Sequence, residues 1–281
     1  LTTAQAKSLI DEVASFGRTV FIFSGGEPLV RPDLFELVAY AREKNLPIAL
    51  STNGTLVTPE LARRIKEAGI YYASVSLDGA TAQTHDLFRG AGAYDKTIQG
   101  MDDMLAEGIK VQINFTVTRM NVKDVPAVYE LARKHQVIAL YLFLLVPVGC
   151  GVEIAESQML SKEEVDEWLR WVVQKDAQGP LPLKAICAPQ YYRIEHEAGA
   201  KADAPIATER KGCLAGLHMC FVSHKGDVFP CGYLPLSAGN VKDTPFRKIW
   251  TESPALDRLR DSGLLTGRCG GCGYKDVCGG C

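Results

Sequence analysis

The chain has 281 residues, of which 47% are hydrophobic and 23% are charged, a composition typical of a globular protein with a sizeable core. Its 31 basic and 33 acidic residues nearly balance, so the net charge of -2 gives no electrostatic reason to expect a nucleic acid or an anionic membrane as a partner. The most apolar run, residues 138–148, is too short to span a bilayer, and we interpret it as a buried strand.

Predicted helices and strands alternate along the first part of the chain. Hydrophobic periodicity and capping residues predict helices at 3–15, 33–44, 59–69, 94–106 and 123–134, and one after the capping box of Ser161 and Glu164. Strands are predicted at 19–23, 47–50, 71–77, 111–117 and 139–146. Because each strand is mostly apolar on both faces, we expect an α/β fold with a parallel sheet covered by helices.

Polar residues gather where the predicted strands end. The first strand runs into Ser24-Gly25-Gly26-Glu27-Pro28 before a helix opens, and glycines let a ligand approach the backbone closely. Later strand ends carry Ser51-Thr52-Asn53, Ser76 with Asp78, Asn114, and Pro147-Val148-Gly149. One polar strand end would be an ordinary turn. Five in succession predict a site, because barrel-type α/β proteins assemble their active sites from strand ends.

Cysteines are concentrated near the end of the chain, where seven of the nine lie at or after Cys213. Their spacing is Cys213-x6-Cys220-x10-Cys231 and then Cys269-x2-Cys272-x5-Cys278-x2-Cys281, with a hairpin turn expected at 224–227. Close thiolates suit a zinc ion or an iron–sulfur cluster. A zinc ribbon is the simpler alternative, but seven thiolates exceed the need of one zinc ion and the last two pairs are unusually close. We therefore favour iron–sulfur over zinc, and both over disulfides.

Four motifs, in this order, resemble those of the radical S-adenosylmethionine (SAM) enzymes. They are Gly25-Gly26-Glu27-Pro28, Ser51-Thr52-Asn53-Gly54, Ser74-Val75-Ser76-Leu77-Asp78-Gly79 and His85-Asp86-Leu87-Phe88-Arg89-Gly90. The cysteine-rich tail resembles the SPASM extension of that family, which holds auxiliary [4Fe–4S] clusters. Further stretches at 143–151, 187–193, 212–216 and 230–235 are similar to the branch that acts on siroheme-derived tetrapyrroles.

The resemblance implies an α/β fold made of a partial (β/α)6 barrel over residues 1–178, a bridging segment over 179–212 and a SPASM-type cluster domain over 213–281. Within the bridging segment we expect a linker at 199–211. The family's Cys-x3-Cys-x2-Cys loop, which holds the SAM-binding cluster, is not in this sequence, and we expect it on a segment before Leu1. The final Cys278-x2-Cys281 spacing is one residue tighter than the common pattern.

The resemblance also implies roles for individual residues. Gly25, Gly26 and Glu27 would receive the methionine amino group of SAM, and Arg89 would bind its carboxylate through a forked guanidinium. The ribose and the other polar atoms of methionine would fall to Asn53, Ser76, Asp78 and Asn114. Cluster ligands would be Cys213, Cys220, Cys231, Cys269, Cys272, Cys278 and Cys281. A substrate with several propionates would meet Tyr191, Tyr192 and Arg193.

The activity implied is radical chemistry on iron-coproporphyrin III. A reduced cluster cleaves SAM to a radical that takes hydrogen from a propionate, carbon dioxide leaves, and a vinyl group remains, giving haem b. An auxiliary cluster would accept the electron, and a donor such as flavodoxin or ferredoxin would supply electrons. The alternatives are a didecarboxysiroheme deacetylase, a haem d1 enzyme, a peptide-modifying SPASM enzyme, and a non-catalytic scaffold for a cluster or zinc. We expect a cytoplasmic protein that has neither nucleic acid nor membrane as partner.

Overall fold

The computed structural model describes residues 1–17, 19–199 and 212–280. These residues form two compact units, Leu1–Tyr141 and Leu142–Cys281. Residues 200–211, most of the expected linker, lie outside the described part, as does Cys281. Among the described helices, none combines the length and apolar character needed to cross a membrane.

The main sheet is built from strands that follow one another in chain order. Strands β1 (Phe21–Phe23), β2 (Ile48–Thr52), β3 (Tyr72–Ser76) and β4 (Lys110–Val117) pair in parallel. Strands β5 (Ala139–Leu144) and β6 (Leu183–Ile186) complete a six-stranded sheet in the order β1-β2-β3-β4-β5-β6. The register sets Ser51 beside Ser74 and Ser76 beside Asn114. The polar carboxyl ends of β1 to β4 therefore meet at one edge, and the predicted α/β class is confirmed.

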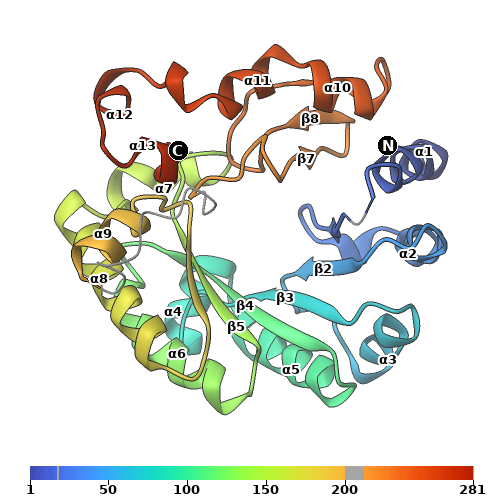
Figure 1. Ribbon diagram of the computed structural model, residues 1–281. Helices are drawn as coiled ribbons and strands as arrows, with labels where there is room; N and C mark the ends of the chain where they lie inside the picture. The colour runs from blue at the N-terminus through green and yellow to red at the C-terminus, as the bar shows by residue number, and fades with distance from the viewer. Residues whose placement is uncertain (18, 200–211, 281) are drawn as a thin grey trace. The chain divides into compact units, whose positions relative to one another are not determined.

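The helices of the first unit alternate with its strands, and α2, α3 and α5 lie along one face of the sheet (Figure 1). Thr58 shows how the sequence starts such a helix, because its Oγ1 accepts the N–H of Leu61 at 3.2 Å while Pro59 occupies the first turn of α3. The elements are α1 (Thr3–Ala14), α2 (Leu34–Glu43), α3 (Pro59–Glu67), α4 (Ala82–Arg89), α5 (Ala93–Ala106) and α6 (Val125–Lys134), with 3-10 turns η1 (Pro28–Val30) and η2 (Val122–Asp124).

The two faces of this sheet differ in chemistry. Along β2, β3 and β4, fully buried positions such as Leu50, Val75 and Ile113 alternate with half-buried ones. The half-buried positions are mostly polar: Ser51, Ser74, Ser76, Gln112, Asn114 and Thr116. The expectation that these strands are apolar on both faces is therefore wrong. One face joins the helical core, and the other presents polar side chains near the strand ends.

The second unit begins with helices α7 (Gly151–Gln158) and α8 (Lys162–Gln178), and then β6 and α9 (Tyr191–Glu197). The predicted capping box is confirmed, because the N–H of Glu164 donates to Ser161 and the Glu164 carboxylate accepts the N–H of Ser161 at 2.6 Å. Strand β6 and helix α9 lie in the bridging segment over 179–212, for which the sequence analysis predicted neither a strand nor a helix. Each is seven residues or shorter, so neither gives a strong periodic signal.

The cysteine-rich region has only short elements. Strands β7 (Phe221–Val222), β8 (Asp227–Phe229) and β9 (Gly239–Asn240) form a small antiparallel sheet, and Gly226 turns the predicted hairpin with a φ of 97°. The helices are α10 (Phe246–Glu252), α11 (Pro254–Arg260), α12 (Gly267–Gly270) and α13 (Lys275–Cys278), with the turn η3 (Ser262–Leu264). Small regions of this kind usually depend on a metal or on disulfides for stability.

Candidate functional site

A pocket of about 360 Å³ lies in the first unit, next to the ends of β2 and β3. Three of the predicted SAM-binding residues, Asn53, Ser76 and Arg89, line it together. The other lining residues come from the β2–α3 loop and from the segment of α4 and α5: Thr55, His85, Gly90, Ala91, Gly92, Ala93, Lys96 and Thr97. Motifs that are separate in the sequence thus converge on one cavity.

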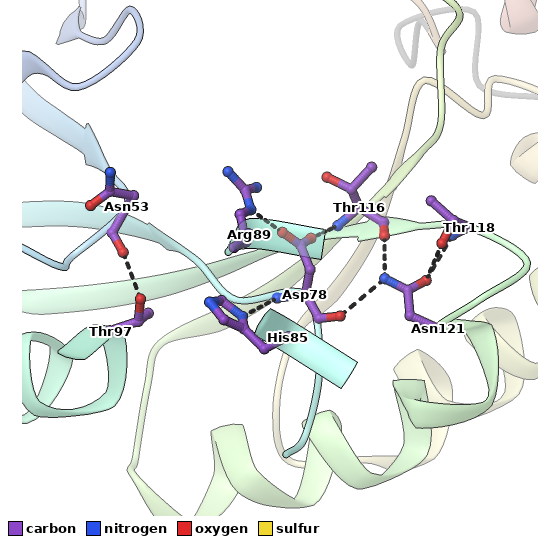
Figure 2. A network of polar contacts seen from close by, with 8 residues as sticks. All are labelled: Asn53, Asp78, His85, Arg89, Thr97, Thr116, Thr118 and Asn121. Carbon is purple, nitrogen blue, oxygen red and sulfur yellow. Dashed lines mark hydrogen bonds and ion pairs between the residues drawn. The ribbon is translucent and has the colours of Figure 1, made fainter. Parts of the chain in front are cut away.

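Asp78 joins the ends of β3 and β4 next to the pocket-lining Arg89 (Figure 2). Its side chain is fully buried, and its carboxylate pairs with Arg89 and accepts the N–H of Thr116 at 2.5 Å. Its own N–H donates to Nδ1 of His85 at 3.0 Å. Both carboxylate oxygens are therefore occupied, and this geometry supports a role in positioning Arg89. The direct contact of Asp78 with SAM stays a prediction.

Asn121, which the sequence analysis missed, completes the network from the other side. Its Nδ2 donates to the carbonyl oxygens of Asp78 at 3.0 Å and Thr116 at 2.9 Å. Its Oδ1 accepts from the N–H of Thr118 at 2.8 Å and from the hydroxyl of Thr118 at 2.9 Å. This buried amide thus fixes the chain on both sides of the Asp78 carboxylate. A single asparagine in a turn carries no pattern that would reveal this role.

Arg89 stands at the edge of the pocket, with a side chain that is 32% exposed. Its Nε donates to Asp78, whereas its two terminal nitrogens form no hydrogen bond with any described residue. Figure 2 shows these nitrogens directed away from Asp78. A guanidinium that is held at Nε and open at its fork suits a carboxylate ligand, which fits the predicted role of Arg89.

Glu27 ties the end of β1 to the end of β2. Its carboxylate accepts the N–H of Leu29 at 3.1 Å, the hydroxyl of Thr52 at 2.8 Å and the N–H of Asn53 at 2.8 Å. Gly25, with a φ of 138°, and Gly26 stand in open space, where an added Cβ would meet nothing within 4 Å. The backbone at these glycines is thus accessible to a ligand, while Glu27 also holds the Asn53 loop. The SAM contacts of all three residues stay predictions.

The remaining predicted residues lie on the polar face of the sheet. The side-chain oxygen of Asn53 accepts the N–H and the hydroxyl of Thr55, each at 2.8 Å, which leaves its amide nitrogen available to a ligand. Ser76 lies in register with Asn114, whose Oδ1 accepts from Gln112 at 2.6 Å. Asn114 does not line the pocket, so its contribution to SAM binding stays a prediction.

The pocket is lined by the imidazole ring of His85 and by two basic side chains, Arg89 and Lys96. Burial lowers the pKa of His85, nearby Arg89 lowers it further, and Asp78 acts in the opposite direction. Asp86 accepts the N–H groups of Tyr94 and Gly92, each at 2.7 Å, and these bonds hold the pKa of Asp86 below its usual value. The amino end of α5 is therefore already capped by an acid of the chain.

A larger hollow, of about 670 Å³, lies among α1, α2 and α3. Arg31 and Asp33 line it and form an ion pair at 2.7 Å, so their charges already balance each other. It contains none of the predicted site residues. The chemistry therefore assigns the ligand site to the smaller pocket at the strand ends.

The thiols of the second unit form two overlapping groups. Burial, reinforced by the nearby thiols of Cys231 and Cys213, raises the pKa of Cys187 to about 12. Burial also raises the pKa of Cys278, with Cys269, Cys272 and Cys213 adding to the effect. Cys213 belongs to both groups, and its N–H donates to the carbonyl of Cys278 at 3.1 Å.

This donor set fits an iron–sulfur group, because positive metal charge favours the thiolate form that burial and crowding oppose. Two backbone N–H groups point at sulfur, from Tyr233 to Cys231 and from Tyr274 to Cys272, each at 3.4 Å, as suits cluster ligands. Within the described residues, no three His, Cys, Asp or Glu side chains meet as a site for a metal ion.

Cys187 was missed as a candidate ligand because it stands far from the other cysteines in the sequence. The signal that could have found it is its place in the 187–193 motif. Burial alone raises the pKa of Cys220 to about 11, with no neighbouring thiol contributing, so its predicted ligand role stays a prediction. Cys281 lies outside the described residues.

The predicted substrate residues all lie on α9. Arg193 pairs with Asp166 at 2.8 Å and with Glu197 at 2.9 Å, so its charge is already balanced. The rings of Tyr191 and Tyr192 meet edge to face with centroids 5.7 Å apart. These contacts are typical of local packing and leave no unpaired positive charge on Arg193 for a propionate. The substrate contacts of the three residues stay predictions.

Comparisons with known protein families match both parts of the chain. Residues 1–132 match the Radical SAM superfamily, and residues 213–281 match the SPASM iron–sulfur cluster-binding domain. The AdoMet-dependent heme synthase of Methanosarcina barkeri is 44% identical over the whole chain and 82% of its own length. That of Nitratidesulfovibrio vulgaris is 41% identical over the whole chain and 78% of its length. The Fe-coproporphyrin III synthase of Methanosarcina barkeri is 35% identical, with the whole chain and 75% of that protein covered.

Solved structures share the fold at low sequence identity. Native anSMEcpe with bound AdoMet matches with a TM-score of 0.71 and 20% identity, over the whole chain and 80% of that protein. Streptococcus suis SuiB bound to S-adenosylmethionine matches with a TM-score of 0.73 and 14% identity, over 98% of the chain and 64% of that protein. At such identities the likeness concerns the fold alone.

Proposed function

The chain belongs to the radical SAM superfamily and, within it, to the family of AdoMet-dependent heme synthases, and on this premise we propose that it converts propionates of iron-coproporphyrin III to vinyl groups, giving haem b. The observation that carries the proposal is the 44% identity to such a synthase over the whole chain. The SPASM match and the crowded thiols support the same chemistry, because it needs a redox group besides SAM.

The reaction fixes what the protein must do. Each propionate loses one hydrogen atom and carbon dioxide, and one electron must leave for the vinyl double bond to form. When bound, SAM and a reduced [4Fe–4S] cluster supply the radical that takes the hydrogen atom. The protein must hold SAM, aim the substrate and exclude water.

The strand-end pocket is suited to holding SAM. Arg89 offers its open guanidinium fork to the methionine carboxylate, and Gly25 and Gly26 offer accessible backbone to the amino group. Asn53 and Ser76 line the same pocket with polar groups that suit ribose hydroxyls. Glu27, Asp78 and Asn121 keep these groups in place through bonds within the chain.

The cysteine module, defined as residues 213–281, would hold auxiliary iron–sulfur clusters. The sequence predicts Cys213, Cys220, Cys231, Cys269, Cys272 and Cys278 as ligands among the described residues, and Cys187 joins them by its position. A cluster there supplies the kind of redox group that can accept the electron released during vinyl formation.

We further propose that an electron donor such as flavodoxin or ferredoxin serves the enzyme and that it works in the cytoplasm, without nucleic acid or membrane as partner. The described cysteines are all free thiols, which suits a reducing compartment. The net charge of -2 gives no reason to add a polyanionic partner.

The test is an anaerobic assay of the purified enzyme with reductant, SAM and iron-coproporphyrin III, in which 5′-deoxyadenosine and porphyrin products are followed by mass. We expect loss of two carboxyl groups and formation of haem b. A parallel assay offers didecarboxysiroheme. Enzyme that ignores iron-coproporphyrin III but consumes didecarboxysiroheme would be a deacetylase, and the proposed function would be wrong.

A further inference from the structure

His85 is a buried side chain at the pocket for which the SAM motifs gave no role. Its side chain is 1% exposed, yet it lines the cavity together with Asn53, Ser76 and Arg89. It stands one helical turn before Arg89 on α4, so both side chains lie on the same face of that helix. Both therefore reach Asp78, where His85 accepts the backbone N–H and Arg89 pairs with the carboxylate.

The hydrogen bond from Asp78 fixes the protonation of the ring. Because Nδ1 accepts the N–H of Asp78, the proton of the neutral imidazole must be on Nε2. Burial lowers the pKa of His85, which keeps the ring neutral near pH 7. The contact of Tyr94 with the ring, edge to face with centroids 5.8 Å apart, further limits its orientation.

The backbone at Gly79 lets the His85 ring lie close to the end of β3. A Cβ at Gly79 would lie 2.5 Å from the backbone nitrogen of His85, so only glycine lets α4 approach the end of β3 so closely. Figure 2 shows the ring between Asp78 on one side and the Asn53–Thr97 pair on the other. Its Nε2 forms no hydrogen bond with any described residue. Because the ring lines the pocket, a ligand bound there can accept this N–H.

We propose that Nε2–H of His85 donates a hydrogen bond to SAM in this pocket. A neutral donor suits an uncharged acceptor, a ribose oxygen or an adenine nitrogen, while Arg89 beside it suits the carboxylate. This inference rests on the proposed SAM chemistry of the chain. It makes His85 a binding residue with two duties, because Nδ1 supports the Asp78 loop and Nε2 contacts the ligand.

Two substitutions separate these duties. The side-chain oxygen of His85→Asn reaches about as far as Nδ1, so this variant retains an acceptor for Asp78 and loses the donor in the pocket. His85→Gln places an amide nitrogen near the position of Nε2, so it retains a donor for the ligand and loses the inner acceptor. A matched control is His135→Asn, because His135 pairs with Asp102 and does not line the pocket.

The experiment measures the Kd of SAM by equilibrium dialysis on anaerobic, cluster-loaded, unreduced holoenzyme, beside thermal melting. We expect His85→Asn to raise the Kd about 10-fold with a nearly unchanged Tm. His85→Gln should bind within about 3-fold of the wild type but melt lower, since one hydrogen bond to SAM is retained and the inner one is lost. His135→Asn should match the wild-type Kd. An unchanged Kd for His85→Asn would overturn the role of His85, whereas wild-type enzyme that binds no SAM would overturn the proposed function itself.

If His85→Asn does not fold, histidine ¹⁵N resonances of the wild-type holoenzyme give a second test. His85 should show a neutral ring protonated at Nε2, and addition of SAM should shift that resonance. A His85 resonance that SAM leaves unmoved would overturn the proposal.

Discussion

The strand-end pocket and the cysteine module hold their functional groups in opposite ways. In the pocket, Asp78, Asn121 and Glu27 bind other parts of the chain and set Arg89 and Asn53 in place before any ligand arrives. In the module, the elements are short, and burial raises the pKa of Cys187 and Cys278, with neighbouring thiols adding to the effect. The pocket is thus built by the fold, whereas the module gains its favourable state when a metal cluster binds.

The difference follows from the chemistry of the two proposed ligands. SAM is an organic molecule that enters and leaves in each turnover, so its site must survive without it. An iron–sulfur cluster stays bound and joins the short segments that carry its cysteines. We therefore expect the pocket to respond to single substitutions in affinity, and the module to respond in cluster content and electron transfer.

The largest expected effect comes from breaking the module. Replacing Cys269 or Cys272 by Ala should lower haem b formation more than about 100-fold, because the released electron loses its acceptor, while SAM cleavage stays within about 3-fold. The measurement compares 5′-deoxyadenosine with porphyrin products. Cys150→Ala, at an exposed thiol apart from the two groups, is the control. Haem b formation at the normal rate in the Cys269 and Cys272 variants would remove the module from electron transfer.

The second largest expected effect is a loss of stability when Asn121, whose buried amide joins the ends of β3 and β4, is replaced. Asn121→Ala deletes four hydrogen bonds and leaves buried carbonyl and N–H groups unpaired, which should lower the free energy of unfolding by about 3 kcal/mol. Urea unfolding followed by circular dichroism measures this loss. Lys123→Ala, at an exposed position of η2, is the control. A loss below about 1 kcal/mol would mean that Asn121 does not hold the strand ends together.

Arg89→Gln should weaken SAM binding about 30-fold, because a charged fork for the carboxylate is replaced by a neutral amide. Equilibrium dialysis gives the Kd, and thermal melting should show a smaller loss from the partly unpaired Asp78. The control is Arg133→Gln, which removes an exposed ion pair with Glu130 outside the pocket. A wild-type Kd for Arg89→Gln would show that the open guanidinium fork does not bind SAM.

The smallest expected effect is a pH dependence that belongs to His85. Its pKa is lowered in the folded state by burial, so the unfolded chain takes up a proton first as the pH falls below about 6.5. The folded state thus loses stability from that pH downward until His85 itself protonates. Urea midpoints between pH 7.5 and pH 5.5 should fall more in the wild type than in His85→Asn. Equal slopes would show that His85 contributes nothing to acid sensitivity.

The sequence predicted those features that repeat or that follow a local rule. Short apolar runs between helical segments predicted β2, β3 and β4. The capping pair of Ser161 and Glu164 predicted the start of α8. The motifs predicted that Asn53, Ser76 and Arg89 share a site, and all three line one pocket. These features depend on neighbours in the sequence, which periodicity and motifs can report.

Features that depend on distant contacts could not be predicted. Asn121 gains its role only because β3 and β4 end side by side, and Cys187 because the chain returns to Cys213 and Cys231. The polar face of β2 to β4 was predicted to be apolar for a related reason. Serine, glutamine and asparagine are scattered among apolar residues, and only the register aligns them.

Hydrogen–deuterium exchange on cluster-free and cluster-loaded protein tests the central difference most directly. The backbone of β2 to β4 and the segment of Asp78 and Asn121 should be equally protected in both forms, because the chain itself holds them. Residues 212–280 should be protected only in the loaded form. Equal protection of the cysteine module in both forms, or loss of protection around Asp78 when the clusters are removed, would contradict this account.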